Sequence, residues 1–177
     1  RLLLLEKLPN QVINTMDQET ERIVGLLQDP QISGSWDRRG LVMGHVQSGK
    51  TSNYTAVVSK AADAGYKLIV IIAGVNNNLR NQTQRRIDEG FIGKNSSKLL
   101  STIIDQQFIG VGHYDKKRFP STFTSSIKDF NKNTATSVGV PLQNMNEPAV
   151  LVIKKNSSVL KNLIEWLKDA NISMGTS

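Results

Sequence analysis

The chain has 177 residues, a length typical of one α/β domain, and it contains no cysteine and only two histidines. This composition excludes disulfides, thiolate metal sites and cysteine nucleophiles, and it argues against a histidine metal cluster. The formal charge of +7, from 22 Lys and Arg against 15 Asp and Glu, favours a polyanionic partner such as nucleic acid. No apolar run approaches the roughly 20 residues of a membrane span, so we expect no membrane contact. The lack of cysteine and the scarcity of histidine fit a reducing cytoplasm, where we expect the protein to lie.

The first predicted elements lead up to a glycine-containing turn. Apolar residues recur at helical spacing over residues 9–27, which predicts a helix within a helical lead-in of residues 1–35. The sequence Gly-Leu-Val-Met at residues 40–43 predicts a short buried strand. A helix is expected over residues 49–64, with Gly65 as its C-terminal cap.

The later elements alternate between strand and helix. Residues 68–73 are continuously apolar, which predicts a strand buried on both faces of a parallel sheet. Residues 76–89 predict a polar helix, residues 148–153 another buried strand, and residues 157–170 an amphipathic helix. Residues 109–147 are polar and irregular, and we interpret them as an insertion or a mobile region. The alternation predicts an α/β fold with right-handed crossovers.

Residues 44–51 match the phosphate-binding pattern G-x-x-x-x-G-K-[ST], between a predicted strand and a predicted helix. Glycines permit a tight turn whose N–H groups face phosphate oxygens. Lys50 would reach the β and γ phosphates, and the Thr51 hydroxyl would ligate Mg²⁺, so we predict ATP and Mg²⁺ as cofactors and these two residues as the catalytic ones. The pattern predicts an incomplete P-loop NTPase domain over residues 36–177. The predicted nucleotide-binding residues are Gly44, Gln47, Ser48, Gly49, Lys50 and Thr51.

Hydrolysis also requires a carboxylate that holds Mg²⁺ at the end of another strand. Asp105 is a candidate, whereas Asp88 and Glu89 follow a helical segment and are rejected. His45 is expected to be a variable loop position with no catalytic role. We expect the acidic motif to lie beyond the end of this chain, so that the fragment alone does not hydrolyse ATP.

The second and third predicted strands are each followed by a polar segment, residues 76–86 and residues 154–156. Amides and cations at such helix starts suit phosphate contacts, and the carboxyl ends of parallel strands share one edge of the sheet. The alternative interpretation is a pair of solvated helix faces. The run Lys116-Lys117-Arg118 is interpreted as a solvated surface. The predicted DNA-contacting residues are Asn78, Arg80, Gln82, Lys154 and Lys155.

Five strings of the sequence carry a resemblance to a known family: residues 40–51, 60–66, 79–86, 153–156 and 160–163. Together they resemble the bacterial Z-one domain endonuclease family. The resemblance implies a RecA-like ATPase core, similar to superfamily-two helicases and to the motors of restriction systems, with a role on DNA in restriction or phage defence. It also implies that residues 78–82 and 154–156 contact the DNA strand, and that an acidic Mg²⁺ motif follows the last helix. No carboxylate cluster of a two-metal nuclease is visible.

The expected function is therefore the N-terminal, ATP-binding part of a helicase-like DNA endonuclease, with DNA and the C-terminal half of the same protein as partners. Two alternatives stay open. One is a P-loop kinase or small-molecule NTPase, which would need an arginine-rich lid and would not be stimulated by DNA. The other is a non-catalytic, nucleotide-gated DNA-binding module, favoured if the parent protein lacks an Asp-Glu pair shortly after residue 177.

Overall fold

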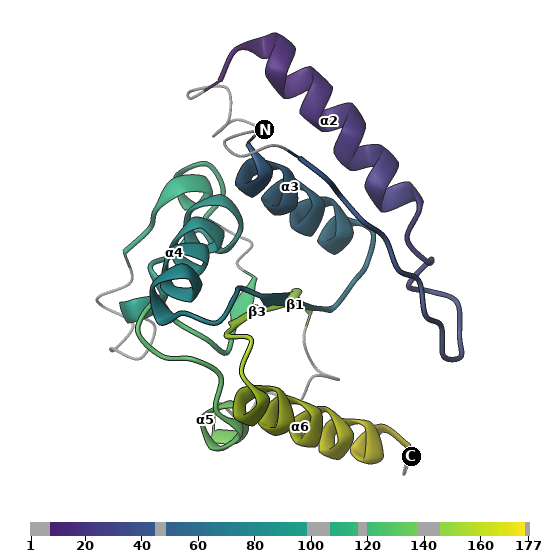
Figure 1. Cartoon of the computed structure of the whole chain (residues 1–177), viewed down its shortest axis with the longest axis vertical. Helices are drawn as coiled ribbons and strands as arrows, with labels where there is room; N and C mark the ends of the chain where they lie inside the picture. Colours follow the sequence, from purple (N-terminus) through teal and green to yellow (C-terminus); the bar gives the residue numbers. More distant parts are fainter. Residues whose placement is uncertain (1–7, 45–48, 99–106, 117–119, 138–145, 176–177) are drawn as a thin grey trace. The chain divides into compact units, whose positions relative to one another are not determined.

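The computed structural model describes residues 8–44, 49–98, 107–116, 120–137 and 146–175. The chain divides into two compact units, Arg1–Tyr66 and Lys67–Ser177. Among the described residues it is a mixed α/β protein, with helices in both units and a small parallel sheet in the second (Figure 1).

In the first unit, α2 (Asn10–Gly25) packs against α3 (Lys50–Asp63). Ile13 of α2 and Val58 of α3 are buried. The Lys60 ammonium joins the two helices, because it lies 3.0 Å from Asp17 Oδ1 and 2.8 Å from Glu21 Oε2. Both predicted helices are confirmed.

The predicted C-terminal cap of α3 is also confirmed. The N–H of Gly65 donates to Ala62 O at 3.0 Å, and that of Tyr66 donates to Ala61 O at 3.0 Å. These bonds satisfy carbonyls that the end of a helix leaves without partners.

The strand predicted over residues 40–43 is wrong for this structure. Leu41 and Met43 are 82% and 85% exposed, and no strand pairing among the described residues includes this segment. A four-residue apolar run has no intrinsic strand geometry of its own, since strand preference depends on a pairing neighbour and a covering surface.

The second unit is built on a parallel sheet with the strand order β1-β3-β2. β1 (Leu68–Ile72) pairs along its length with β3 (Ala149–Ile153), from Leu68 beside Ala149 to Ile72 beside Ile153. β2 (Ser121–Thr122) pairs only with the first two residues of β3. β3 is buried throughout, whereas β1 is half-buried and ends on the exposed Ile72. The two long strands and their parallel arrangement are confirmed, and β2 was not predicted. The expected burial of β1 on both faces is wrong, because its residues are half-buried or exposed.

Helices flank this sheet. α4 (Asn77–Ile87) follows β1 and continues into the π-helical turn η1 (Asp88–Ile92). α6 (Ser157–Gly175) follows β3, and Figure 1 shows α4 and α6 on opposite sides of the strands. The shorter helical turns are η2 (Ser96–Lys98), η4 (Gly110–His113) and α5 (Lys132–Ser137).

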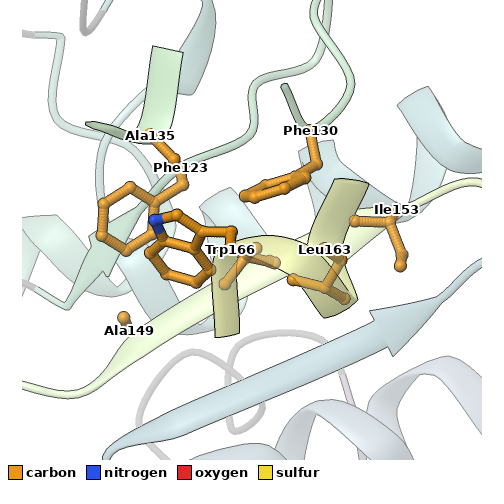
Figure 2. Packing of buried hydrophobic residues seen from close by; sticks show 8 residues of the cluster. Phe123, Phe130, Ala135, Ala149, Ile153, Leu163 and Trp166 are labelled. Atoms are coloured by element: carbon orange, nitrogen blue, oxygen red, sulfur yellow. The ribbon is translucent and has the colours of Figure 1, made fainter. Parts of the chain in front are cut away.

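The core under α6 is aromatic. Figure 2 shows Trp166 packed near Phe123 and Phe130, with ring centroids 5.2 Å and 5.4 Å away. The interpretation of residues 109–147 as an insertion or mobile region is therefore wrong for residues 120–135, which supply part of the core. Their apolar residues are isolated in polar sequence without a period, so patterning could not detect them. The buried cluster comprises Phe123, Phe130, Ala135, Ala149, Leu151, Ile153, Leu163 and Trp166.

Two turns on the other side of this unit meet backbone to backbone. A Cβ atom on Gly112 of η4 would lie 1.9 Å from Gly93 O, and one on Gly110 would lie 1.9 Å from Glu89 O. The N–H of Ile109 donates to Gly93 O at 3.0 Å. The approach of η4 to η1 therefore requires residues without side chains.

Candidate functional site

The second half of the phosphate-binding pattern lies at the start of α3. Gly49 is the N-cap, with a left-handed backbone (φ 76°, ψ 18°) that glycine adopts without strain. The helix begins at Lys50, and among the described residues no side-chain hydrogen bond caps its N-terminus. First-turn amides point out of a helix end, so this start of α3 offers N–H donors and a positive dipole end to an anion.

Lys50 turns back toward the start of the pattern. Its Nζ donates to the carbonyl of Gly44 at 2.7 Å, which brings the two ends of the 44–50 segment within one side-chain length of each other. Thr51 is half-buried in the first turn of α3. His45, Gln47 and Ser48, which lie between these ends, are outside the described residues.

The donor set fits a phosphate. It combines an ammonium group, the first-turn amides of a helix and a glycine that permits close approach, and the adjacent Thr51 hydroxyl is a hard oxygen suited to Mg²⁺. In the described part of the chain, no three His, Asp or Glu side chains gather into a metal-binding group. The candidate carboxylate Asp105 lies outside the described residues.

A second group of polar residues gathers at the carboxyl ends of β1 and β3, which we call the strand-end junction: residues 73–78, 125–130 and 152–156. The Ala73 N–H donates to Ile153 O at 2.8 Å, and the Lys155 N–H donates to Gly74 O at 2.6 Å. Lys154 Nζ donates to Asn77 Oδ1 at 2.9 Å. The prediction that the two segments emerge side by side is thus confirmed.

Helix starts and basic side chains face outward at this junction. Asn78, Gln82 and Lys155 are exposed, and Lys154 is half-buried. α4 has no side-chain cap at its N-terminus, whereas the Asn156 side chain accepts from the Ser158 N–H at 2.9 Å at the start of α6. The arrangement offers cations and helix amides to a phosphate backbone.

Arg80 differs from its predicted role. It is 1% exposed, and its guanidinium is directed into the protein, so in this structure it is not available to contact DNA. Its five N–H groups donate to four acceptors: Asn81 Oδ1 and the carbonyls of Ser125, Lys128 and Val152. Sequence placed Arg80 on a polar helix but could not show which side of that helix is covered.

Below Arg80, buried polar side chains form a directional chain of hydrogen bonds. The Val152 N–H donates to Thr124 Oγ1 at 2.9 Å, and Thr124 Oγ1 donates to Gln84 Oε1 at 2.7 Å. Gln84 Nε2 then donates to Asp88 Oδ1 at 2.9 Å. Asp88 also accepts from the backbone N–H of Ser96 at 3.0 Å. Burial raises the pKa of Asp88, although these hydrogen bonds act in the opposite direction. The hydrogen bonds from Gln84 and Ser96 hold the Asp88 carboxylate in the interior of the second unit.

Asp129 is a junction residue that sequence reasoning missed. Its carboxylate accepts from the Phe130 N–H at 2.8 Å and from the Lys154 N–H at 3.3 Å. No motif or period marks it, because its partner lies 25 residues away along the chain.

Comparisons with models of known protein families, with curated proteins and with solved structures found no match to this chain. None of the helices in the described ranges combines the length and the apolar content needed to cross a bilayer.

Proposed function

We propose that this protein binds ATP with Mg²⁺ through the segment from Gly44 to Thr51. The observation that carries the proposal is the start of α3, where Gly49 is the N-cap, Lys50 and Thr51 lie in the first turn, and Lys50 Nζ donates back to the carbonyl of Gly44. A sequence match alone could fall anywhere in a fold, whereas here the helix begins at the lysine of the pattern.

The chain's own groups would perform distinct tasks. The Lys50 ammonium would exchange the neutral Gly44 carbonyl for negatively charged phosphate oxygens, and a contact between two charged groups is stronger than one to a neutral carbonyl. First-turn amides of α3 would donate to the same phosphates, and the Thr51 hydroxyl would hold Mg²⁺. When bound, the metal would neutralise charge that develops on the β and γ phosphates.

We further propose that the parent protein is a DNA-acting ATPase with a RecA-like P-loop core, related to the Z-one domain endonucleases and their restriction or defence roles. The formal charge of +7 and the strand-end junction support this proposal. Exposed Asn78, Gln82 and Lys155, together with Lys154, would contact phosphates without reading sequence. Arg80 no longer belongs to this set.

Calorimetric titration of the chain with a non-hydrolysable ATP analogue and Mg²⁺ tests the nucleotide site. Lys50→Ala should weaken binding at least tenfold, because hydrogen bonds to charged groups contribute about 1.5–3 kcal/mol. Arg22→Ala, which removes an exposed cation from α2 in the same unit, is the matched control and should bind like the wild type. Equal affinities for wild type and Lys50→Ala would overturn the assignment.

A further inference from the structure

Arg80 connects three segments that are far apart in sequence. Nη1 donates to Lys128 O at 3.1 Å and to Val152 O at 3.3 Å, and Nη2 donates to Ser125 O at 2.6 Å. The remaining donors bind Asn81 Oδ1 on α4 itself. One planar side chain thus ties α4 to the 125–128 segment and to the end of β3.

In the described part of the chain, no strand pairs with this end of β3 on the side away from β1. β2 pairs only with the first two residues of β3, so it does not extend to Val152. There the Thr124 hydroxyl accepts from the Val152 N–H, and Arg80 donates to the Val152 carbonyl. Arg80 therefore supplies a hydrogen bond that a neighbouring strand would otherwise make to β3. A shorter or non-planar cation could not reproduce this arrangement of donors.

The residues fixed by Arg80 are next to those that face outward. Asn77 lies in the same first turn of α4, and Lys154 follows Val152 by two residues. Asp129, next to Lys128, accepts from the Lys154 N–H. Both partners of the Asn77–Lys154 hydrogen bond are thus attached to backbone that the guanidinium holds.

We propose that Arg80 is a positioning residue of the strand-end junction: it touches no nucleic acid, and it holds the Asn77–Lys154 pair in the geometry from which Lys154 contacts phosphates. The proposal rests on the proposed DNA-binding function. This role differs from direct contact with DNA, and the two roles predict different responses to substitution of Arg80.

The test is fluorescence anisotropy with a labelled oligonucleotide at several salt concentrations, on the wild type, Arg80→Lys, Lys154→Ala and the double variant. Arg80→Lys keeps the charge but loses the planar fork. It should weaken binding about threefold to tenfold, the range expected for coupled neighbours, and it should lower the salt slope by no more than Lys154→Ala does. The double variant should bind no more weakly than Lys154→Ala alone. Additive losses, or wild-type binding by Arg80→Lys, would overturn the proposal.

Asn77→Ala provides a second test if Arg80→Lys fails to fold, because Asn77 is exposed and its side chain is not part of the core. It should show the same non-additivity with Lys154→Ala, and additivity there would also count against the proposal. Lys161→Ala, an exposed lysine on α6, is the control for charge loss and should not couple to either position.

Hydrogen exchange separates this proposal from the DNA function on which it rests. Arg80→Lys should speed exchange at the amides of Val152, Lys154 and Lys155, while Leu163 in the middle of α6 stays protected. Unchanged protection at all of these amides would overturn the positioning role whether or not DNA binds. If the wild type binds no DNA at low salt, the DNA function fails, and faster exchange in Arg80→Lys would leave the residue with a structural role alone.

Discussion

At the scale of single residues, Asp88 is fully buried and is the final acceptor in a chain of hydrogen bonds. Burial raises its pKa, so the folded protein holds a proton on Asp88 more readily than the unfolded chain does. Its contribution to the free energy of unfolding is therefore fully present below the unfolded-state pKa and is lost as the pH rises through the raised, folded-state pKa.

Asp88→Asn should remove this dependence. As the pH falls from about 7 toward 4, the wild type should gain stability relative to the variant, because only the wild type takes up a proton at this position. Urea unfolding of both proteins at several pH values measures the difference. A difference in unfolding free energy that is constant with pH would show that Asp88 has no raised pKa.

Gly112 poses a steric question. A Cβ there would lie 1.9 Å from the backbone oxygen of Gly93, which cannot move aside as a side chain could. Gly112→Ala should lower the free energy of unfolding by about 1–3 kcal/mol or more, as in other overpacked sites. Gly25→Ala is the matched control, since a Cβ at Gly25 meets nothing within 4 Å. Similar stabilities for the two variants in urea would contradict the close approach of η4 to η1.

At the scale of elements, α6 depends on its first turn as well as on its buried face. Asn156 Oδ1 accepts from the Ser158 N–H at 2.9 Å, and Leu163 and Trp166 anchor the helix in the aromatic core. Asn156→Ala should cost about 1 kcal/mol of stability, the usual effect of losing an N-cap. Thermal unfolding can measure this. Ser157→Ala, at an exposed position of the same turn, should change little, and an equal loss there would assign the effect to the turn as a whole.

The elements also show how far sequence reasoning reached. Helical spacing of apolar residues predicted α2 and α6, the phosphate-binding pattern and Gly65 predicted α3, and a polar run predicted α4. Continuous apolar runs predicted β1 and β3. Each of these signals is local, which is why sequence reasoning could use it. Such reasoning failed for residues 40–43, where an apolar run has no pairing neighbour among the described residues, and for residues 120–135. Phe123 and Phe130 pack in the core against residues far along the chain, among them Trp166 some 40 residues later, and no local pattern encodes such contacts.

The candidate sites divide in the same way. The lysine and threonine of the phosphate-binding pattern were placed correctly at a helix start, since that pattern is a local backbone motif. Adjacency of Asn77 and Lys154 followed from the parallel sheet. The burial of Arg80 did not, because helix position alone cannot say which polar side chain finds carbonyls to bind.

At the scale of the whole molecule, the net charge of +7 attracts any polyanion. DNA binding at the strand-end junction must therefore be distinguished from non-specific electrostatic attraction. Replacing Lys154 and Lys155 with alanine should reduce the slope of log affinity against log salt by roughly one to two units. Replacing Lys161 and Lys168, which are exposed on α6, removes the same charge and should change the slope less. Equal changes in the slope would mean that DNA binding depends on the net charge and not on the strand-end junction.

The pairing of β1 with β3 also bears on how the chain is made. Leu68 lies beside Ala149, about 80 residues later in the sequence, so this parallel sheet has high contact order and is expected to form slowly. On a ribosome, β1 is synthesised first and its five apolar residues must wait for β3 before they can pair. A nascent chain paused before Ala149 therefore presents an apolar segment that chaperones can bind, and synthesis beyond α6 would release it.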